Sequence, residues 1–418
     1  MEKSGKFRLT SLERNWILYD VGNSAFVLMV ATLIPIFFNA LAESGGLSSV
    51  EYLAYWGYAS SAVTVITAVL SPILGTVADT KGFKKPIFIL CVFVGIVGCC
   101  AMGAVSAWLP FLVIFVIAKV GFSGSLVFYD SMLSDVTTPE RMDEVSSRGY
   151  AWGYIGSCVP FVVCLGLVLG AGSIGISQMT ALNLALLLTA AWWLFTTLPL
   201  LKSYKQLYYV EVEKHAVRQS FARIGHTLRH LPEDKQVFWF LLAFFCYIDG
   251  VYTIIDMATA YGTALGLDTT GLLLALLVTQ IVAFPSALIF GRLSNKYPSA
   301  KLIPVCIAAY AGIAVFAFFL TRQWQFWVLA VIVGMFQGGV QALSRSHFAK
   351  IIPPEKSGEY FGLFDICGKG ASFLGTMIVS VGSQLTGSAN VGVGSLIVLF
   401  IVGFVLFRVS CKKEVVSE

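Results

Sequence analysis

Long apolar stretches separated by short polar segments run through the whole 418-residue chain. A helix that crosses a membrane needs about 20 mainly apolar residues, and twelve stretches meet this condition. They lie at approximately 16–41, 53–78, 86–106, 109–135, 148–171, 177–200, 236–261, 269–293, 302–320, 325–350, 359–384 and 390–409. The pattern predicts an all-α integral membrane protein with twelve transmembrane helices.

The longest polar segment, 201–235, separates the first six stretches from the last six. It is rich in Lys and Arg and holds three of the four histidines. We therefore expect an N-terminal six-helix bundle over residues 1–200, a basic cytoplasmic linker over 201–235, and a C-terminal six-helix bundle over 236–418.

The composition agrees with a membrane protein and excludes soluble classes. The chain is 57% hydrophobic and 12% charged, whereas soluble domains are about 45–50% apolar and about 25% charged. A surface with so few charges excludes a soluble enzyme, a nucleic-acid-binding domain and a disordered tail. The expected surroundings are a lipid bilayer, and no nucleic-acid partner is expected.

The basic residues predict the orientation, because cytoplasmic loops of membrane proteins carry an excess of Lys and Arg. With the N-terminus inside, 25 of the 28 Lys and Arg residues fall on the cytoplasmic side. Only Arg322 falls outside, and Lys119 and Lys369 lie within spans. We expect a multi-pass protein with both termini in the cytoplasm, and the net charge of +5 then reflects this orientation.

The two halves of the chain repeat each other. After the second and eighth spans, Gly75 matches Gly291, Asp79 matches Asn295 and Lys85 matches Lys301, always 216 residues apart. Before the fifth and eleventh spans, Pro139, Glu140, Glu144 and Gly153 match Pro354, Glu355, Glu359 and Gly368, 215 residues apart. Two six-helix repeats with a substrate site between them are typical of secondary transporters.

The loop Gly75-x-x-x-Asp79-x-x-Gly82-x-Lys84-Lys85 resembles the signature loop of the major facilitator superfamily. The resemblance implies the major facilitator fold, with two pseudo-symmetric bundles. It also implies that this loop latches the bundles together on the cytoplasmic side. The alternative is a topology anchor with no gating role. Physically, Asp79 at the end of a span suits a helix N-terminus or a basic partner, Gly82 permits a tight turn, and the two lysines hold the loop in the cytoplasm.

Three further stretches resemble a narrower family, the autophagy-related vacuolar amino-acid effluxers and their bacterial relatives. They are Trp16–Phe26 with its Tyr-Asp-x-x-Asn-Ser-Ala-Phe run, Gly149–Gly156, and Gly338–Ser346 followed by 359–369. This resemblance implies movement of amino acids, coupled to an ion gradient. One departure is Asp130, which follows Tyr129 where the family is expected to have Asn. The short loops suit a member from a bacterial cytoplasmic membrane.

Charged side chains within spans are the main candidates for function, because each costs about 2.5–3.5 kcal/mol at the membrane centre and therefore needs a cavity or a partner. Asp249 lies near the middle of the seventh span and is the first candidate for proton coupling. Asp256, seven residues later, shares its face of the helix, with Tyr252 beside both. The alternative for Asp249 is a carboxylate held in a static hydrogen-bond network.

The other intramembrane charges form possible pairs. Asp365 and Lys369 are four residues apart on one helical face, so they either neutralise each other or bind a substrate carboxylate through the lysine. Arg345, at the cytoplasmic end of its span, more readily pairs with Asp20 or Asp365 at an inner gate than binds substrate. Asp20, with Asn23 one turn on, either belongs to that gate or handles substrate and protons.

The candidate cavity residues are Asp20, Asn23, Lys119, Asp130, Asp249, Tyr252, Asp256, Gln337, Gln341, Asp365 and Lys369. The candidate gate residues are Gly75, Asp79, Gly82, Lys84, Lys85 and Arg345. Several tryptophans near span ends, Trp16 among them, are expected in the aromatic belts at the membrane surface.

No Gly-x-x-x-x-Gly-Lys-Ser/Thr loop, nucleophile–base constellation or metal-ligand cluster occurs in the sequence, so neither an enzyme nor a cofactor is expected. Three functions stay open. The favoured one is a secondary transporter of a small polar solute, most readily an amino acid, acting by alternating access as a monomer with protons as the coupling ion. The alternatives are a proton-coupled efflux pump for drugs or organic cations, and an intramembrane enzyme or sensor.

Overall fold

The computed structural model describes residues 7–211, 225–227 and 229–411. The first half forms helices α1 (Ser11–Ala31), α2 (Leu33–Ser44), α3 (Ser49–Ala78), α4 (Lys84–Met102), α5 (Trp108–Ser131), α6 (Leu133–Val136), α7 (Met142–Leu169) and α8 (Gln178–Ser203). The second half forms the short 3₁₀ helices η1 (Leu231–Glu233) and η2 (Pro354–Lys356) with α10 (Lys235–Ala264), α11 (Thr269–Ser294), α12 (Ser299–Phe318), α13 (Gln323–Ile351), α14 (Ser357–Thr386), α15 (Ala389–Gly394) and α16 (Ile397–Ser410). Every predicted span falls on one of these helices or on a consecutive pair.

Eleven helical stretches among the described residues are long and apolar enough to cross a membrane. In that set α1 and α2 form one span and α15 and α16 form another. The 30-residue helix α14 is not in the set, but it occupies the predicted eleventh span. With it the helices form the twelve-helix major facilitator fold predicted from the sequence.

Side-chain caps define where several of these helices begin. Thr10 accepts the backbone N–H of Glu13 and Glu13 returns a bond to the N–H of Thr10, which forms a capping box at the start of α1. Ser48 and Glu51 form the same arrangement at α3. Such caps satisfy backbone donors that have no partner inside the helix.

The two halves of the fold meet along two seams, where α3 packs on α14 and α7 packs on α11. The second span thus contacts the eleventh, and the fifth contacts the eighth. The internal repeat, which matches the second span with the eighth and the fifth with the eleventh, makes these two contacts equivalent. Glycines bring the backbones close at both. A methyl group on Gly75 would collide with the backbone of Gly358, and one on Gly291 would lie 2.8 Å from Cβ of Ser147.

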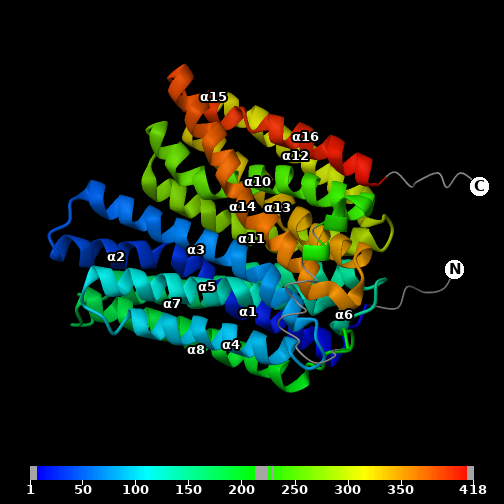
Figure 1. The fold of residues 1–418 in the computed structure, drawn as a ribbon. Helices are drawn as coiled ribbons and strands as arrows, with labels where there is room; N and C mark the ends of the chain where they lie inside the picture. The colour runs from blue at the N-terminus through cyan, green and yellow to red at the C-terminus, as the bar shows by residue number, and fades with distance from the viewer. Residues whose placement is uncertain (1–6, 212–224, 228, 412–418) are drawn as a thin grey trace, which may run out of the picture.

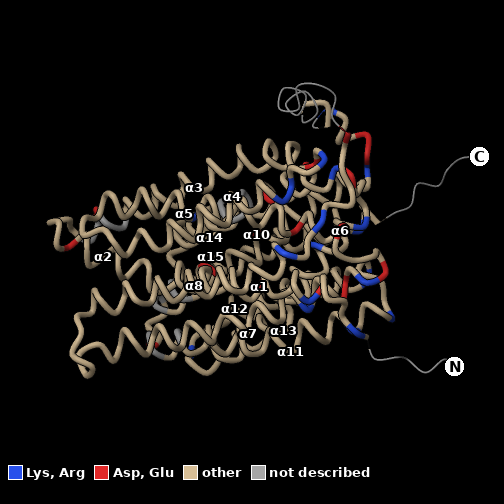
Figure 2. Tube along the Cα trace, turned by 90° about the horizontal axis from the view of Figure 1, so that it is seen from below, with Lys and Arg blue, Asp and Glu red and all other residues tan. Residues whose placement is uncertain are grey.

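The start of α1 and the end of α16 lie at the same end of the molecule (Figure 1). Lys, Arg, Asp and Glu residues gather at that end and are sparse along the rest of the helices (Figure 2). We refer to it as the charged end and to the opposite one as the far end.

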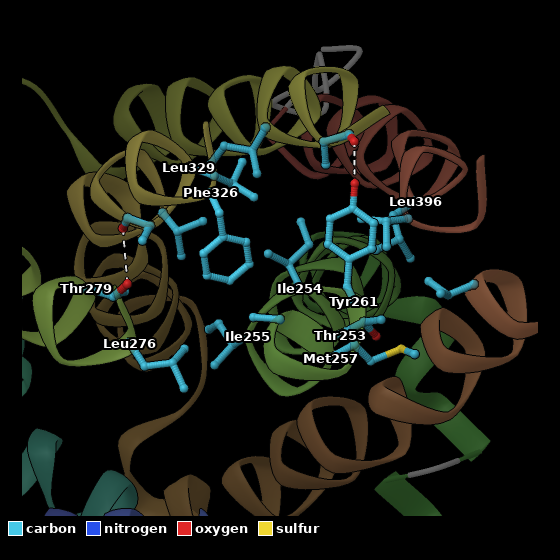
Figure 3. A pocket seen from close by; sticks show the side chains of 17 residues that line it. Thr253, Ile254, Ile255, Met257, Tyr261, Leu276, Thr279, Phe326, Leu329 and Leu396 are labelled. Atoms are coloured by element: carbon cyan, nitrogen blue, oxygen red, sulfur yellow. Dashed lines mark hydrogen bonds between the residues drawn. The ribbon is translucent and has the colours of Figure 1, made fainter. Parts of the chain in front are cut away.

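Equivalent positions of the two repeats are filled differently. In the first half, Phe26 stacks on Trp193 with ring centroids 5.6 Å apart, and Phe115 stacks on Trp56 at 4.5 Å. In the second half, Ala330 stands 215 residues after Phe115 and lines a cavity between the helices (Figure 3).

Apolar side chains from α10 to α16 line most of this cavity. The hydroxyl of Tyr261 donates to the carbonyl of Ala317, and that of Thr279 donates to the carbonyls of Ala275 and Ala330. These polar groups on the wall are therefore satisfied by the protein itself, which makes the cavity an apolar one.

The close approach of α3 to α14 predicts the effect of a single methyl group. Gly75→Ala should prevent full closure of the charged end, because the methyl group meets backbone, and overpacking of this kind costs about 1–3 kcal/mol. Electron–electron double resonance between spin labels at positions 140 and 355 should report a longer distance. Gly57→Ala is the matched control, since nothing lies within 4 Å of its added Cβ; equal distances in the two variants would contradict this account of the seam.

Candidate functional site

At the charged end, the loop between α3 and α4 holds the start of α14. The carboxylate of Asp79 accepts the backbone N–H of Gly358 at 2.7 Å and that of Glu359 at 2.8 Å. These two N–H groups belong to the first turn of α14, where the helix dipole favours a negative charge. Asp79 thus has the helix N-terminus that its position predicted, and Lys84, the basic group, lies 3.8 Å away.

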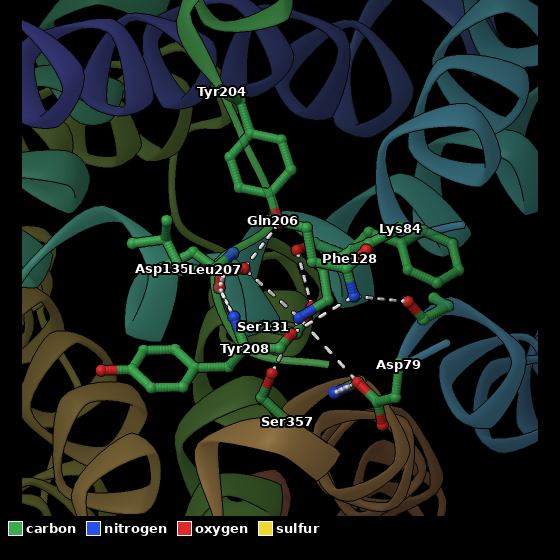
Figure 4. A network of polar contacts seen from close by, with 12 residues as sticks. Asp79, Lys84, Phe128, Ser131, Asp135, Tyr204, Gln206, Leu207, Tyr208 and Ser357 are labelled. Carbon is green, nitrogen blue, oxygen red and sulfur yellow. Dashed lines mark hydrogen bonds and ion pairs between the residues drawn. The ribbon is translucent and has the colours of Figure 1, made fainter. Parts of the chain in front are cut away.

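Lys84 has a different role from the one its sequence position suggested. We predicted a cytoplasmic anchor, but the side chain is fully buried. Its ammonium group lies 3.4 Å from the carboxylate of Asp135 and donates to the hydroxyl of Ser357 at 2.9 Å (Figure 4). The sequence did not indicate this burial, because the counter-ion Asp135 lies 51 residues away. Its neighbour Lys85 is partly buried and donates weakly to the carbonyl of Tyr204 at 3.5 Å.

Asp135 also forms hydrogen bonds with the start of the linker, a role that the sequence did not indicate. One of its oxygens accepts the backbone N–H groups of Leu207 and Tyr208, both at 2.9 Å, and the other accepts the hydroxyl of Tyr204 at 2.6 Å (Figure 4). Burial and the adjacent carboxylate raise the pKa of Tyr204, so its hydroxyl keeps the proton that it donates. No spacing rule could have identified Asp135, because its partners are remote in the chain.

The linker segment 204–210 continues onto the loop itself. The side chain of Gln206 accepts the N–H of Gly82 at 3.0 Å and donates to the carbonyl of Ala78 at 3.1 Å. The N–H of Val210 donates to the carbonyl of Asp79 at 2.7 Å. Gly82 has φ +80°, as the predicted tight turn requires. The latch therefore comprises the loop, α14 and the first part of the linker.

The repeat-related loop after α11 makes a different contact. The amide of Asn295 donates to the carboxylate of Glu144 at 2.6 Å, and Glu144 also pairs with Arg148 at 2.7 Å. Nearby, Asp143 accepts the hydroxyl of Ser346 at 2.6 Å and pairs with Lys350 at 2.6 Å. The second seam is thus joined by side chains of both halves, whereas in the first seam an acid binds a helix N-terminus.

Deeper between the halves, Arg345 from α13 enters a group of side chains on the first half. Its Nη1 lies 2.9 Å from the carboxylate of Asp130 and 3.7 Å from that of Asp20. Its Nε and Nη2 donate to the hydroxyl and the carbonyl of Ser146, at 2.9 and 3.0 Å. Of the two predicted partners, Asp20 is present; the closer acid, Asp130, stands at the repeat-related position 215 residues before the arginine.

Three aromatic rings surround the same guanidinium group. Its carbon lies 4.7 Å from the ring centroid of Trp16, 4.3 Å from that of Tyr150 and 5.4 Å from that of Tyr129. The expectation that Trp16 lies in a surface belt is wrong, because the ring is fully buried. It stacks on Tyr129 at 4.3 Å, and its indole N–H donates to the carbonyl of Tyr129 at 3.0 Å.

The remaining candidates lie in distinct surroundings. Gln341 accepts the hydroxyl of Tyr154 at 2.8 Å, and Asp365 accepts that of Ser71 at 2.8 Å, so both join the two halves. Gln337 is buried on α13, one turn from Gln341. Asn23 donates to the carbonyl of Tyr19 within its own helix, at 3.0 Å. The side chain of Lys369 lies outside the described residues.

Asp256, Lys119 and Tyr252 lie toward the far end from Arg345 along their helices. Asp256 is exposed and is close enough to Lys119 for their charges to interact. The ammonium group of Lys119 lies 4.8 Å from the ring centroid of Phe122. Tyr252 is half-buried and interacts electrostatically with Asp130, Asp365 and Arg345. These groups bring both signs of charge to the space between the halves.

Asp249 is separate from this cluster. It is fully buried between α10 and α14, where its two oxygens accept the N–H of Gly375 at 2.9 and 2.8 Å and one accepts the hydroxyl of Thr253 at 3.3 Å. The seven-residue spacing to Asp256 predicted a shared polar face. The structure instead buries one carboxylate inside the second half and exposes the other.

The comparisons with known proteins agree on one class. A family model described as "Vacuole effluxer Atg22 like" matches residues 11–415. An uncharacterized MFS-type transporter, YxiO of Bacillus subtilis strain 168, is 42% identical over 404 residues, which cover 96% of this chain and 94% of that protein. Autophagy-related protein 22 of Saccharomyces cerevisiae strain S288c is 27% identical over 283 residues, 58% of this chain and 53% of its own length. The match thus spans about half of the fungal protein.

Solved structures show the same fold at low sequence identity. The human organic anion transporter MFSD10 has a TM-score of 0.72 and 14% identity, with 95% of this chain and 98% of that chain covered. The transporter FucP in its outward conformation has a TM-score of 0.71 and 16% identity, with 96% and 98% covered. These relatives and neighbours are membrane transporters rather than enzymes.

The burial of Lys84 between two acids predicts a strong effect of removing its charge. Lys84→Met should lower the stability of the closed structure by about 3–5 kcal/mol, because Asp79 and Asp135 would remain buried without their cation. Thermal unfolding in detergent measures the loss. Lys85→Met is the control and should change little, since Lys85 makes only the weak bond to Tyr204. Equal losses in the two variants would exclude Lys84 as the centre of the latch.

Proposed function

We propose that this chain, which belongs to the Atg22-like vacuole effluxer family of the major facilitator superfamily, moves amino acids across a membrane by alternating access and couples this movement to protons. That it is a multi-pass membrane transporter follows from its family and fold. Amino acids as the substrate class and protons as the coupling ion are what we propose in addition.

The cluster between the halves is the observation that carries the proposal. An amino acid is a zwitterion, and its site needs a cationic and an anionic group together. Arg345 and Lys119 supply the positive charges, and Asp20, Asp130, Asp256 and Asp365 supply the negative ones. The resemblance of the Trp16–Phe26 and Gly338–Ser346 stretches to the vacuolar amino-acid effluxers supports the same class.

The orientation proposed from the basic residues makes the charged end the cytoplasmic one, with both termini on that side of a bacterial cytoplasmic membrane. The closed latch at this end supports alternating access. Asp79 of the first half binds the N–H groups of Gly358 and Glu359 of the second half, and these bonds must break when the halves separate. The rigid units proposed are residues 1–200 and 236–418, joined by 201–235, and a monomer contains the complete site.

Asp249 is the proposed site of proton coupling. Among the described residues its partners are the neutral N–H of Gly375 and the hydroxyl of Thr253. An ionised carboxylate at this depth without a counter-ion is costly, and binding a proton removes the cost. Its place between α10 and α14 supports the coupling of protonation to a movement of these helices.

A second candidate function is proton-coupled efflux of organic cations. The excess of acids over bases in the cluster, together with the aromatic rings of Trp16, Tyr129 and Tyr150, favours cationic ligands. Flux assays separate the two candidates, because an amino-acid transporter requires the substrate carboxylate and a cation pump does not.

Flux in proteoliposomes tests the proposal. The protein should carry labelled neutral amino acids faster when a pH gradient is applied, whereas simple amines should not be carried. In Asp249→Asn, exchange of amino acid for amino acid should persist while gradient-driven accumulation is lost, because the carboxamide takes up no proton. Glu233→Gln, an exposed acid in η1, is the control.

Two results would contradict the proposal. Full gradient-driven accumulation in Asp249→Asn would remove Asp249 from coupling. Absence of amino-acid flux with flux of amines would instead establish the second candidate.

A further inference from the structure

The side chain of Arg345 is a cation from the second half inside a box built by the first. The box, which we name the socket, consists of Trp16 and Asp20 on α1, Tyr129 and Asp130 on α5, and Ser146 and Tyr150 on α7. Aromatic faces beside carboxylates are the chemistry that recognises organic cations. All six groups move with the first half, whereas the cation moves with the second.

We propose that the socket binds the ammonium group of the transported substrate when the charged end opens, and that Arg345 is the internal cation that replaces it on closure. This inference rests on the proposed function and adds the binding site of one substrate group. It also assigns Arg345 a role in release.

The charge balance of the socket is the first argument. Asp20 and Asp130 both lie within 3.7 Å of the same Arg345 nitrogen. When α13 separates from the first half, the two carboxylates stay together and lose their cation. Removing one partner from a buried ion pair leaves an uncompensated charge, which is strongly unfavourable. A cationic group from the opened side compensates it.

The incomplete pairing inside the socket is the second argument. Oδ2 of Asp20 lies 3.7 Å from Nη1 of Arg345, which is beyond hydrogen-bond distance, and the carboxylate also interacts with the hydroxyl of Tyr129. The planar guanidinium already uses Nε and Nη2 on Ser146. A primary ammonium has three donors that rotate freely, so it can reach Asp20 and Asp130 together.

Space for this exchange comes from Gly149. A Cβ at this position would lie 3.0 Å from Oδ2 of Asp20, 3.1 Å from Nη2 of Arg345 and 3.1 Å from the ring of Trp16. The absent side chain leaves room for the guanidinium and for a rotating ammonium group. Because Arg345 and the ammonium group would bind the same two carboxylates, insertion of Arg345 on closure displaces the substrate amino group toward the far end.

A variant that lacks the Arg345 side chain, and so leaves the socket without its cation, tests the inference. In full-length Arg345→Ala purified in detergent, ethylammonium chloride should raise the unfolding temperature relative to sodium chloride at equal ionic strength. The apparent affinity should exceed that of the wild type by about tenfold or more, because the tethered competitor is gone. The gain should disappear in the double variant with Asp130→Asn. Arg322→Ala, an exposed arginine at the far end, is the control and should behave as the wild type.

A second variant covers the case in which Arg345→Ala does not fold. Asp79→Asn loosens the latch and keeps Arg345, so the socket empties more often and ethylammonium should bind more tightly than to the wild type. Equal responses of wild type and variant, or a response that survives Asp130→Asn, would overturn the inference.

Binding and flux separate this inference from the proposed function. If ethylammonium binds the socket but no amino-acid flux is found, the cation site is supported and the proposal that amino acids are the substrates is contradicted. Amino-acid flux in the wild type without any response of the Arg345→Ala variant removes the socket.

Discussion

A charge in a medium of low dielectric constant is stable only beside a counter-charge or several donors, and several kcal/mol per ion depend on that partner. In this chain two of the buried charges take partners from the other half of the molecule. Arg345 on α13 pairs with Asp130 on α5, and Asp79 after α3 binds the first N–H groups of α14. For these two groups, satisfying the charge and closing the two halves on each other are therefore the same event.

The apolar parts of the seams make this pairing possible. The backbones of α3 and α14 touch at Gly75 and Gly358, which brings the Asp79 carboxylate within hydrogen-bond distance of its donors. Lys84 then lies between Asp79 and Asp135 with no exposure to solvent. The small residues allow the two backbones to approach closely, and the hydrogen bonds of Asp79 depend on that short distance.

The spans, the repeat and the loop could be predicted because each depends on neighbouring residues or a fixed offset. The position of Asp79 at the end of a helix predicted that its carboxylate would bind a helix N-terminus or a basic group. The burial of Lys84 and Trp16 could not be predicted, since both depend on residues more than fifty positions away, Asp135 and Tyr129. Helical periodicity predicted that Asp249 and Asp256 share one polar face. It could not predict that Asp249 is buried against α14, where it accepts the backbone N–H of Gly375. The pairing of Asp130 with Arg345 was accessible in principle, as the two stand at equivalent positions of the repeat.

The cavity beside Ala330 has a mechanical consequence. Close-packed interiors are barely compressible, and stacked rings occur in both halves, such as Phe26 with Trp193 in the first and Phe244 with Phe364 in the second. The cavity beside Ala330 leaves the second half with volume that its helices can take up by shifting against one another. A duplicated architecture has in this way acquired, at one of two equivalent positions, a volume into which neighbouring side chains can move.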